Sequence, residues 1–202
     1  MISTPRVMLA VCAIVLSLTS LACSAPLACE GLLRPLDQVH RHHLEGKWAL
    51  IAGSVSDPHL NTKFGLRDSS TTSFSNTTGE SNMLFIRSMR LDNTCQYGSD
   101  NVSLEDNRMT FNNNNITTTF IHTCHDCILM SSDVESGKRL HFYLFSRRRQ
   151  LEKKEMEEYR AQVDCLNLPA PAVMDPTKEL CPDEADYDPT AQPEEKTEGK
   201  KD

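Results

Sequence analysis

The sequence predicts an all-β domain, an antiparallel sandwich or barrel, that is followed by one α-helix. Short strand-like runs recur at nearly regular spacing through the middle of the chain, and turn residues separate them. The hydrophobic period then changes from that of strands to that of a helix. The chain has 202 residues, a length that suits one domain with tails. Its formal net charge of −7 disfavours nucleic acid as a partner, because no broad basic face would neutralise phosphates.

The strands follow one another from residue 48 onwards. The first is expected at residues 48–55, an apolar run that Asp57-Pro58 brings to an end. The others are expected at residues 68–74, 83–91, 101–104, 108–111, 116–122, 127–134 and 140–145. The helix is expected over residues 151–165, because apolar residues form one stripe there, at Leu151, Met156, Tyr159 and Val163.

Both ends of the chain are expected to lie outside this domain, which would occupy residues 26–182. Residues 1–25 have the features of a signal peptide, with Arg6 before an apolar run at 7–18 and small residues after it. The run is shorter than the roughly 20 residues that a spanning helix needs, which disfavours the alternative of a membrane anchor. Residues 183–202 are acidic and are expected to form a disordered tail. A secreted, extracellular, soluble protein is therefore expected.

Cysteines and sequons agree with an oxidising, luminal route. Six cysteines remain beyond the signal region, at Cys29, Cys95, Cys124, Cys127, Cys165 and Cys181. An even number in a secreted chain predicts three disulfides, although the sequence leaves their pairing open. N-glycosylation sequons begin at Asn76, Asn101 and Asn115, which predicts a glycoprotein.

Several segments resemble the lipocalin family. Gly46-Lys47-Trp48, at the head of the first strand, is similar to the Gly-x-Trp signature, and Arg147 or Arg148 is similar to the arginine after the last barrel strand. Asp133-Val134 resembles the second signature without its Thr and Tyr. Longer matches resemble lipocalins of the orosomucoid (α1-acid glycoprotein) and apolipoprotein M type, at 44–48, 84–87, 95–97, 164–166 and 181–182. The segment 104–107, followed by 123–129, is most similar to the fish members, which include lipocalins that bind tributyltin, saxitoxin or tetrodotoxin.

That resemblance implies an eight-stranded antiparallel up-and-down lipocalin barrel with one C-terminal α-helix packed outside. It also implies the disulfides Cys29–Cys165 and Cys95–Cys181, and a barrel end at which Gly46, Trp48 and Arg147 meet. The protein is expected to be a monomer.

Alternation in the strands indicates which side chains face the barrel interior. In 140–145, His141, Tyr143 and Phe145 share one face, and Phe85, Arg87 and Met89 share a face of 83–91. The resemblance implies a ligand-binding cavity lined by Phe85, Arg87, Met89, Met130, Tyr143 and Phe145. Apolar walls with one cation and one phenol suit an apolar ligand that has a polar or anionic end. The orosomucoid residue matching Arg87 is acidic, so a different ligand preference is expected.

Two cysteines and three histidines could also hold a metal. Cys124-His125-Asp126-Cys127 supplies half of a zinc site, but a local disulfide is favoured because no second pair exists in the sequence. An organometal bound by a reduced cysteine is a further alternative. The histidines at 40, 42 and 43 are interpreted as solvated surface residues. No metal and no cofactor are therefore expected.

The sequence carries none of the common catalytic motifs: it has no Gly-x-Ser-x-Gly elbow, phosphate loop or His-Glu-x-x-His helix. A non-enzyme is expected, with a hydrophobic or amphipathic small molecule as its partner. Lipid, steroid, xenobiotic, toxin and organotin ligands all stay open. The alternative is a secreted glycoprotein with a filled barrel that acts through protein–protein contacts, in an acute-phase or immunomodulatory role.

Overall fold

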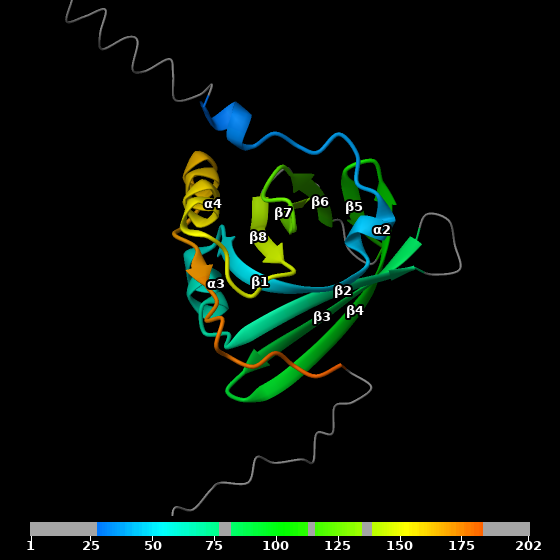
Figure 1. Ribbon diagram of the computed structural model, residues 1–202, viewed down its shortest axis with the longest axis vertical. Helices are drawn as coiled ribbons and strands as arrows, with labels where there is room; N and C mark the ends of the chain where they lie inside the picture. The colour runs from blue at the N-terminus through cyan, green and yellow to red at the C-terminus, as the bar shows by residue number, and fades with distance from the viewer. Residues whose placement is uncertain (1–27, 77–81, 113–115, 135–138, 184–202) are drawn as a thin grey trace, which may run out of the picture.

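The computed structural model describes residues 28–76, 82–112, 116–134 and 139–183, and it contains the expected barrel. The strands are β1 (Gly46–Val55), β2 (Ser69–Asn76), β3 (Asn82–Leu91), β4 (Thr94–Glu105), β5 (Arg108–Phe111), β6 (Ile116–Ile121), β7 (Cys127–Val134), β8 (Arg139–Ser146) and β9 (Ala172–Val173). The helices are α2 (Arg41–Leu44), α3 (Pro58–Phe64) and α4 (Lys153–Cys165), and residues 28–32 are also helical. The predicted eight-stranded antiparallel barrel with one helix packed outside is confirmed (Figure 1).

Strand β1 closes the barrel, because it pairs with β8 on one side and with β2 on the other. Its pairing with β2 covers only residues 46–49. Beyond that point β9 pairs with Ala52 and Gly53 and covers the free edge of β1. A register shift between Leu50 and Ala52 marks a bulge in β1, which bends the strand around the barrel.

Alternation along the strands divides the apolar side chains between two clusters. On β8, Phe145 packs inside the barrel, whereas Phe142 and Leu144 face outwards. The outer cluster lies beneath α4, whose stripe supplies Met156, Tyr159 and Val163. The Tyr159 hydroxyl donates a hydrogen bond of 2.7 Å to the Phe142 carbonyl oxygen, which fixes α4 on β8. The helix is therefore outside the barrel because β8 is apolar on both faces.

One end of the barrel is closed by Trp48. Its side chain is fully buried, and its Nε1 donates a hydrogen bond of 2.7 Å to the Leu44 carbonyl of α2. The Arg147 guanidinium lies 3.9 Å from the Trp48 ring centroid and also donates to the carbonyl oxygens of His43, Glu45 and Lys47. Gly46 has a φ of +88°, and a Cβ there would lie 2.9 Å from Arg147. The three residues of the predicted barrel end therefore lie together.

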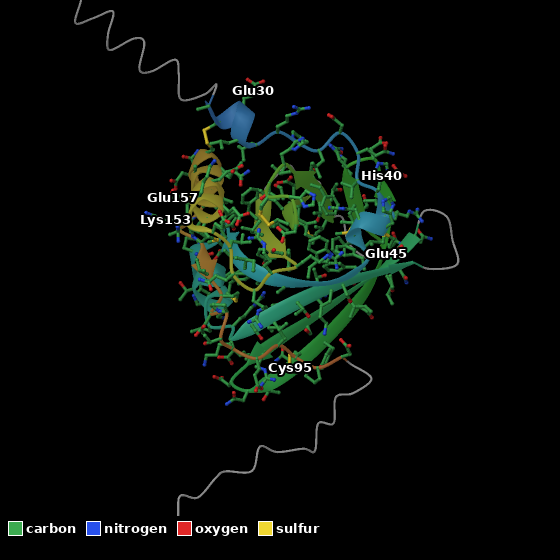
Figure 2. The ribbon with its side chains drawn as sticks, viewed as in Figure 1. Glu30, His40, Glu45, Cys95, Lys153 and Glu157 are labelled. Carbon is green, nitrogen blue, oxygen red and sulfur yellow. A yellow bond between two sulfur atoms is a disulfide. The ribbon has the colours of Figure 1, made fainter. Side chains whose placement is uncertain are left out.

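Three disulfides hold the chain, in the pairs Cys29–Cys165, Cys95–Cys181 and Cys124–Cys127. The first ties the N-terminal segment to α4. The second ties β4 to the C-terminal segment, which runs across the outer face of β2 to β4 (Figures 1 and 2). In the chain-entropy model these long loops give about 5 kcal/mol each, whereas the short Cys124–Cys127 loop gives only about 2 kcal/mol.

Several sequence predictions concern the parts of the chain outside the described residues. These are the signal peptide, Asn115, the threonines after Asn76, and residues 184–202. Asp183, at the start of the predicted tail, forms an ion pair of 2.5 Å with Lys47. Among the described residues, no helix is both long and apolar enough to cross a membrane.

Candidate ligand-binding cavity

A cavity of about 380 Å³ opens at the end of the barrel opposite Trp48. Its volume falls near the lower limit for small-molecule sites. The apolar part of the wall comes from six strands, with Leu50, Phe85, Met89, Phe111, Ile116, Met130 and Phe145. The polar part includes two arginines, Arg67 and Arg87, together with Gln96, Tyr97, Ser132, His141 and Tyr143.

The cavity occupies only part of the barrel interior. Nearer to Trp48, large apolar side chains fill the space between the strands, with Phe74, Met83, Val102, Met109 and Phe120 all almost fully buried. The barrel is therefore filled in the half near Trp48, as the filled-barrel alternative expects, and hollow in the half that contains the cavity.

All six residues predicted to line a cavity face this one, namely Phe85, Arg87, Met89, Met130, Tyr143 and Phe145. They lie on β3, β7 and β8, at positions that the two-residue period of each strand turns inwards. Arg87 lies at the rim, since its side chain is 58% exposed. It forms an ion pair of 3.1 Å with Asp100 on β4, so its charge is already balanced.

A stack of three rings forms one side of the cavity mouth. The ring centroid of Tyr143 lies 5.0 Å from that of Phe64, on α3, and 5.1 Å from that of His141. Gly53 on β1 makes the stack possible, because a Cβ there would lie 2.4 Å from Phe64 and 2.7 Å from Tyr143. Helix α3 is itself fixed by its first turn: the Asp57 side chain accepts a hydrogen bond from the Leu60 backbone N–H, and Pro58 starts the helix.

Arg67 also lines the cavity, although the sequence patterns did not predict it there. It follows α3, its guanidinium lies 4.4 Å from the Phe64 ring centroid, and it lines the cavity together with Tyr143. Within the described residues, no carboxylate lies within ion-pairing distance of Arg67. It is therefore a partly buried cation whose charge no described acidic side chain balances.

Two further groups that line the cavity, Tyr143 and His141, are neutral at neutral pH. Burial raises the pKa of Tyr143 to about 12, so its hydroxyl keeps its proton and remains a donor. Burial lowers the pKa of His141, and the nearby Arg67 and Arg87 lower it further. Burial also lowers the pKa of Arg67, but a guanidinium stays charged at any ordinary pH. The cavity thus offers positive charge and hydrogen-bond donors above an apolar wall.

The remaining predicted sites lie elsewhere on the molecule. Cys124 and Cys127 form a disulfide with each other, at the turn between β6 and β7. The histidines at 40, 42 and 43 are exposed, as Figure 2 shows for His40. Asn101 is exposed on β4, where a glycan can be attached.

Comparison with known proteins agrees with this architecture. Residues 13–184 match the ApoM domain, and this match covers most of the chain. The chain belongs to the ApoM domain family. No curated protein sequence matches the chain significantly.

Solved structures place the ApoM-domain chain in the lipocalin fold. The siderocalin Ex-FABP, which functions through dual ligand specificities, is 18% identical with a TM-score of 0.56, and 65% of this chain and 93% of that chain are covered. Siderocalin Q83, which has a dual ligand binding mode, is 16% identical with a TM-score of 0.60. The match covers 71% of this chain and 96% of that chain. At this level of identity the likeness concerns the fold alone.

Proposed function

We propose that this ApoM-domain chain is an extracellular carrier of an amphipathic small molecule with an apolar body and an anionic end. The observation that carries the proposal is Arg67, a partly buried cation facing the cavity with no carboxylate partner among the described residues. A buried charge is costly to leave unpaired, so a bound anion would stabilise it. The disulfides and the exposed sequon at Asn101 support an extracellular location.

The two parts of the ligand would be held by different forces. The apolar body would lie against Phe85, Met130 and Phe145, where each buried Å² contributes about 25 cal/mol. The anionic end would accept hydrogen bonds from the Arg67 guanidinium and the Tyr143 hydroxyl, in a setting drier than bulk water. Arg87 lies at the rim but is already paired with Asp100, so Arg67 is the cation left for the anionic end.

Binding of 1-anilinonaphthalene-8-sulfonate, an anionic fluorescent probe, tests this proposal. We expect one saturable site whose affinity falls by about tenfold or more in the Tyr143→Ala/Phe145→Ala double variant, because apolar contact and a hydrogen bond are both lost. Leu140→Ala, on the outward face of the same strand, is the matched control and should bind as the unmodified protein does. Equal affinity of the double variant and the control would place the probe outside this cavity. Native mass spectrometry of the secreted protein would then identify the natural ligand.

His141 makes binding of the same probe pH-dependent. Its pKa in the empty cavity is lowered from the ordinary value of 6.5, and a bound sulfonate would raise it again by favouring the imidazolium. We therefore expect affinity to increase as pH falls from about 7.5 to about 5.5, because the sulfonate keeps its charge throughout this range. His141→Gln should remove this increase. The exposed His59, changed to Gln, should retain it.

The same pKa shift has the opposite consequence for the empty protein. Since the unfolded chain binds the proton more tightly than folded His141 does, the contribution of His141 to stability is complete above the ordinary pKa and declines as pH falls below it. Affinity that stays constant with pH in the unmodified protein would contradict a role for His141 beside the anion.

A further inference from the structure

We propose that the Cys124–Cys127 disulfide is a thiol–disulfide exchange site, at which a small thiol attacks Cys124 and Cys127 is the leaving group. The pair lies at the turn between β6 and β7, where Cys127 pairs with Ser146 at the closed end of the barrel. It is therefore separate from the ligand cavity, and the inference does not depend on the proposed carrier function.

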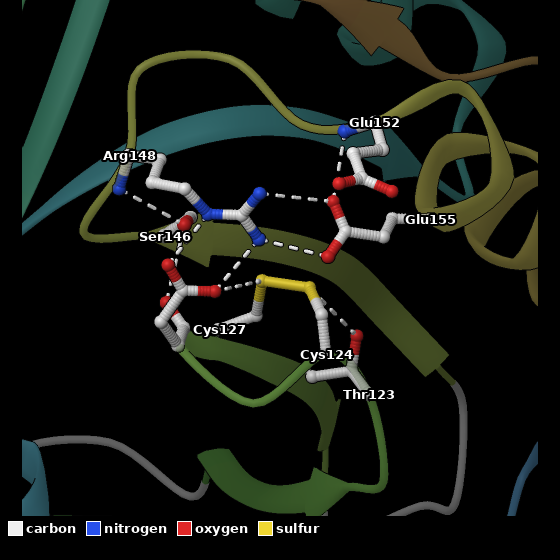
Figure 3. A network of polar contacts seen from close by, with 8 residues as sticks. Thr123, Cys124, Cys127, Ser146, Arg148, Glu152 and Glu155 are labelled. Carbon is white, nitrogen blue, oxygen red and sulfur yellow. Dashed lines mark hydrogen bonds and ion pairs between the residues drawn. A yellow bond between two sulfur atoms is a disulfide. The ribbon is translucent and has the colours of Figure 1, made fainter.

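The turn keeps its other fixed contacts without this disulfide. The Asp126 carbonyl oxygen accepts hydrogen bonds from the Ser146 hydroxyl, at 3.1 Å, and from the Arg147 backbone N–H, at 3.2 Å. The Asp126 carboxylate binds the Arg148 guanidinium, which also reaches Glu155 on α4 at 2.8 Å (Figure 3). The bond itself closes a loop with a sequence separation of only 3, so it constrains the unfolded chain least of the three disulfides. Opening it should leave the barrel folded.

The two cysteine residues differ in exposure. Cys124 is partly exposed, whereas Cys127 is only 5% exposed and belongs to the apolar cluster beneath α4. An incoming thiolate therefore reaches the Cys124 sulfur first. Exchange depends strongly on which sulfur can be attacked, so this difference fixes the direction of the reaction.

Neighbouring polar groups favour the second step of the exchange, in which the Cys124 sulfur is the one that leaves (Figure 3). The Thr123 hydroxyl lies 3.8 Å from the Cys124 Sγ and can donate to it, which favours a thiolate there after reduction. The Cys127 Sγ lies 3.9 Å from the Asp126 Oδ1, a carboxylate oxygen that can accept from an S–H group. Reduction would thus give a nucleophilic Cys124 and a protonated, buried Cys127.

The exchange proceeds in two balanced steps. A thiolate RS⁻ attacks the Cys124 sulfur, a new S–S bond forms, the Cys124–Cys127 bond breaks, and the Cys127 sulfur leaves and takes up a proton. A second RS⁻ attacks the RS sulfur of the mixed disulfide on Cys124. The bond between that sulfur and Cys124 breaks, which releases RSSR and the Cys124 thiolate. Two thiols are oxidised to one disulfide, and the protein disulfide is reduced by the same two electrons.

A metal site is the competing interpretation of this cluster, because ligand atoms of Cys124, Asp126 and Cys127 all lie within 4.8 Å of one another. Both carboxylate oxygens of Asp126 are occupied by the Arg148 guanidinium, however. A metal would have to displace this bidentate ion pair. The geometry therefore favours exchange with a thiol.

The test exposes the folded, full-length secreted protein to reduced and oxidised glutathione, followed by alkylation and peptide mapping. We expect Cys124–Cys127 to open about tenfold faster or more than Cys29–Cys165 and Cys95–Cys181, while the circular dichroism spectrum stays unchanged. The glutathione adduct should lie on Cys124. Opening of all three disulfides together, persistence of Cys124–Cys127, or an adduct on Cys127 would each overturn the proposal.

Two variants separate exchange from simple exposure. Cys127→Ser should accumulate the mixed disulfide on Cys124, because the resolving sulfur is gone. In that background Thr123→Val should shift the alkylation of Cys124 to higher pH, since the thiolate loses its donor. Thr110→Val, an exposed threonine on β5, is the matched control and should leave the alkylation profile unchanged. Identical profiles for the two threonine variants would refute the assigned role of Thr123.

Discussion

Replacing Trp48 by Ala is expected to lower the free energy of unfolding by about 3–5 kcal/mol. The side chain is fully buried, and the substitution removes both its apolar contacts and the ring on which the Arg147 guanidinium rests. It also leaves the Leu44 carbonyl oxygen without its donor. Urea denaturation followed by circular dichroism measures the change.

A matched control for this variant is Leu60→Ala on α3. Leu60 is 52% exposed, so its truncation should change the free energy of unfolding by well under about 1 kcal/mol. Similar losses in the two variants would mean that Trp48 does not anchor the closed end.

Reversing the charge at the cavity mouth should have the largest effect on binding. We expect Arg67→Glu to lower the affinity for 1-anilinonaphthalene-8-sulfonate by about a hundredfold. A charge-assisted hydrogen bond to the probe is lost, and repulsion between two negative charges takes its place. Stability should fall by about 1 kcal/mol, because the cation–π contact with Phe64 is lost whereas no ion pair with a described carboxylate is. Fluorescence titration gives the affinity, and thermal unfolding gives the stability.

Two controls isolate the electrostatic part of this loss. Arg108→Glu makes the same charge change at an exposed position on β5 and should leave binding unaffected. N-phenyl-1-naphthylamine, a neutral analogue of the probe, should bind to Arg67→Gln as it does to the unmodified protein. An equal loss for the neutral and the anionic probe would show that Arg67 shapes the cavity and does not attract the anion.

Much of the barrel could be predicted because short strand-like runs alternate with turn residues at nearly regular spacing. Strand β7, for instance, was expected at 127–134 and β5 at 108–111, and both have those bounds. Tyr143 and Phe145 were expected to face inwards because side chains alternate along a strand, and they line the cavity. The wall of the site could therefore be predicted from pattern, since each wall residue lies on a regular strand.

The mouth of the cavity could not be predicted in this way. Asp57-Pro58 was interpreted only as the end of a strand, although an N-cap residue followed by proline is also a helix start, and α3 begins there. Arg67 lies in the irregular segment between α3 and β2, where no period assigns a side chain to either face. Its position is set by the Phe64 ring, which is a tertiary contact. Strand β4 is also longer than the residues 101–104 that the sequence predicted. Its first half, from Thr94, carries few apolar residues and therefore gave no strand signal.

Arg148 and Arg149 show a second limit of pattern. These residues and Arg147 stand in a row before a helix, and each of the three has its own set of partners. Arg147 covers Trp48, Arg148 joins Asp126 to Glu155, and Arg149 donates to the Asp175 and Lys178 carbonyl oxygens. These partners lie up to about 100 residues away along the chain, a separation over which local sequence carries no signal.

The division of the barrel into a filled half and a hollow half separates two selective demands. Residues around Trp48, Phe74 and Phe120 hold the strands together, so substitutions there threaten folding itself. Those around the opening line the cavity, and under the proposed function they contact the ligand more than they contact one another. Under the proposed function, a variant of this chain can therefore change its ligand through residues at the cavity mouth and keep the core that stabilises the barrel.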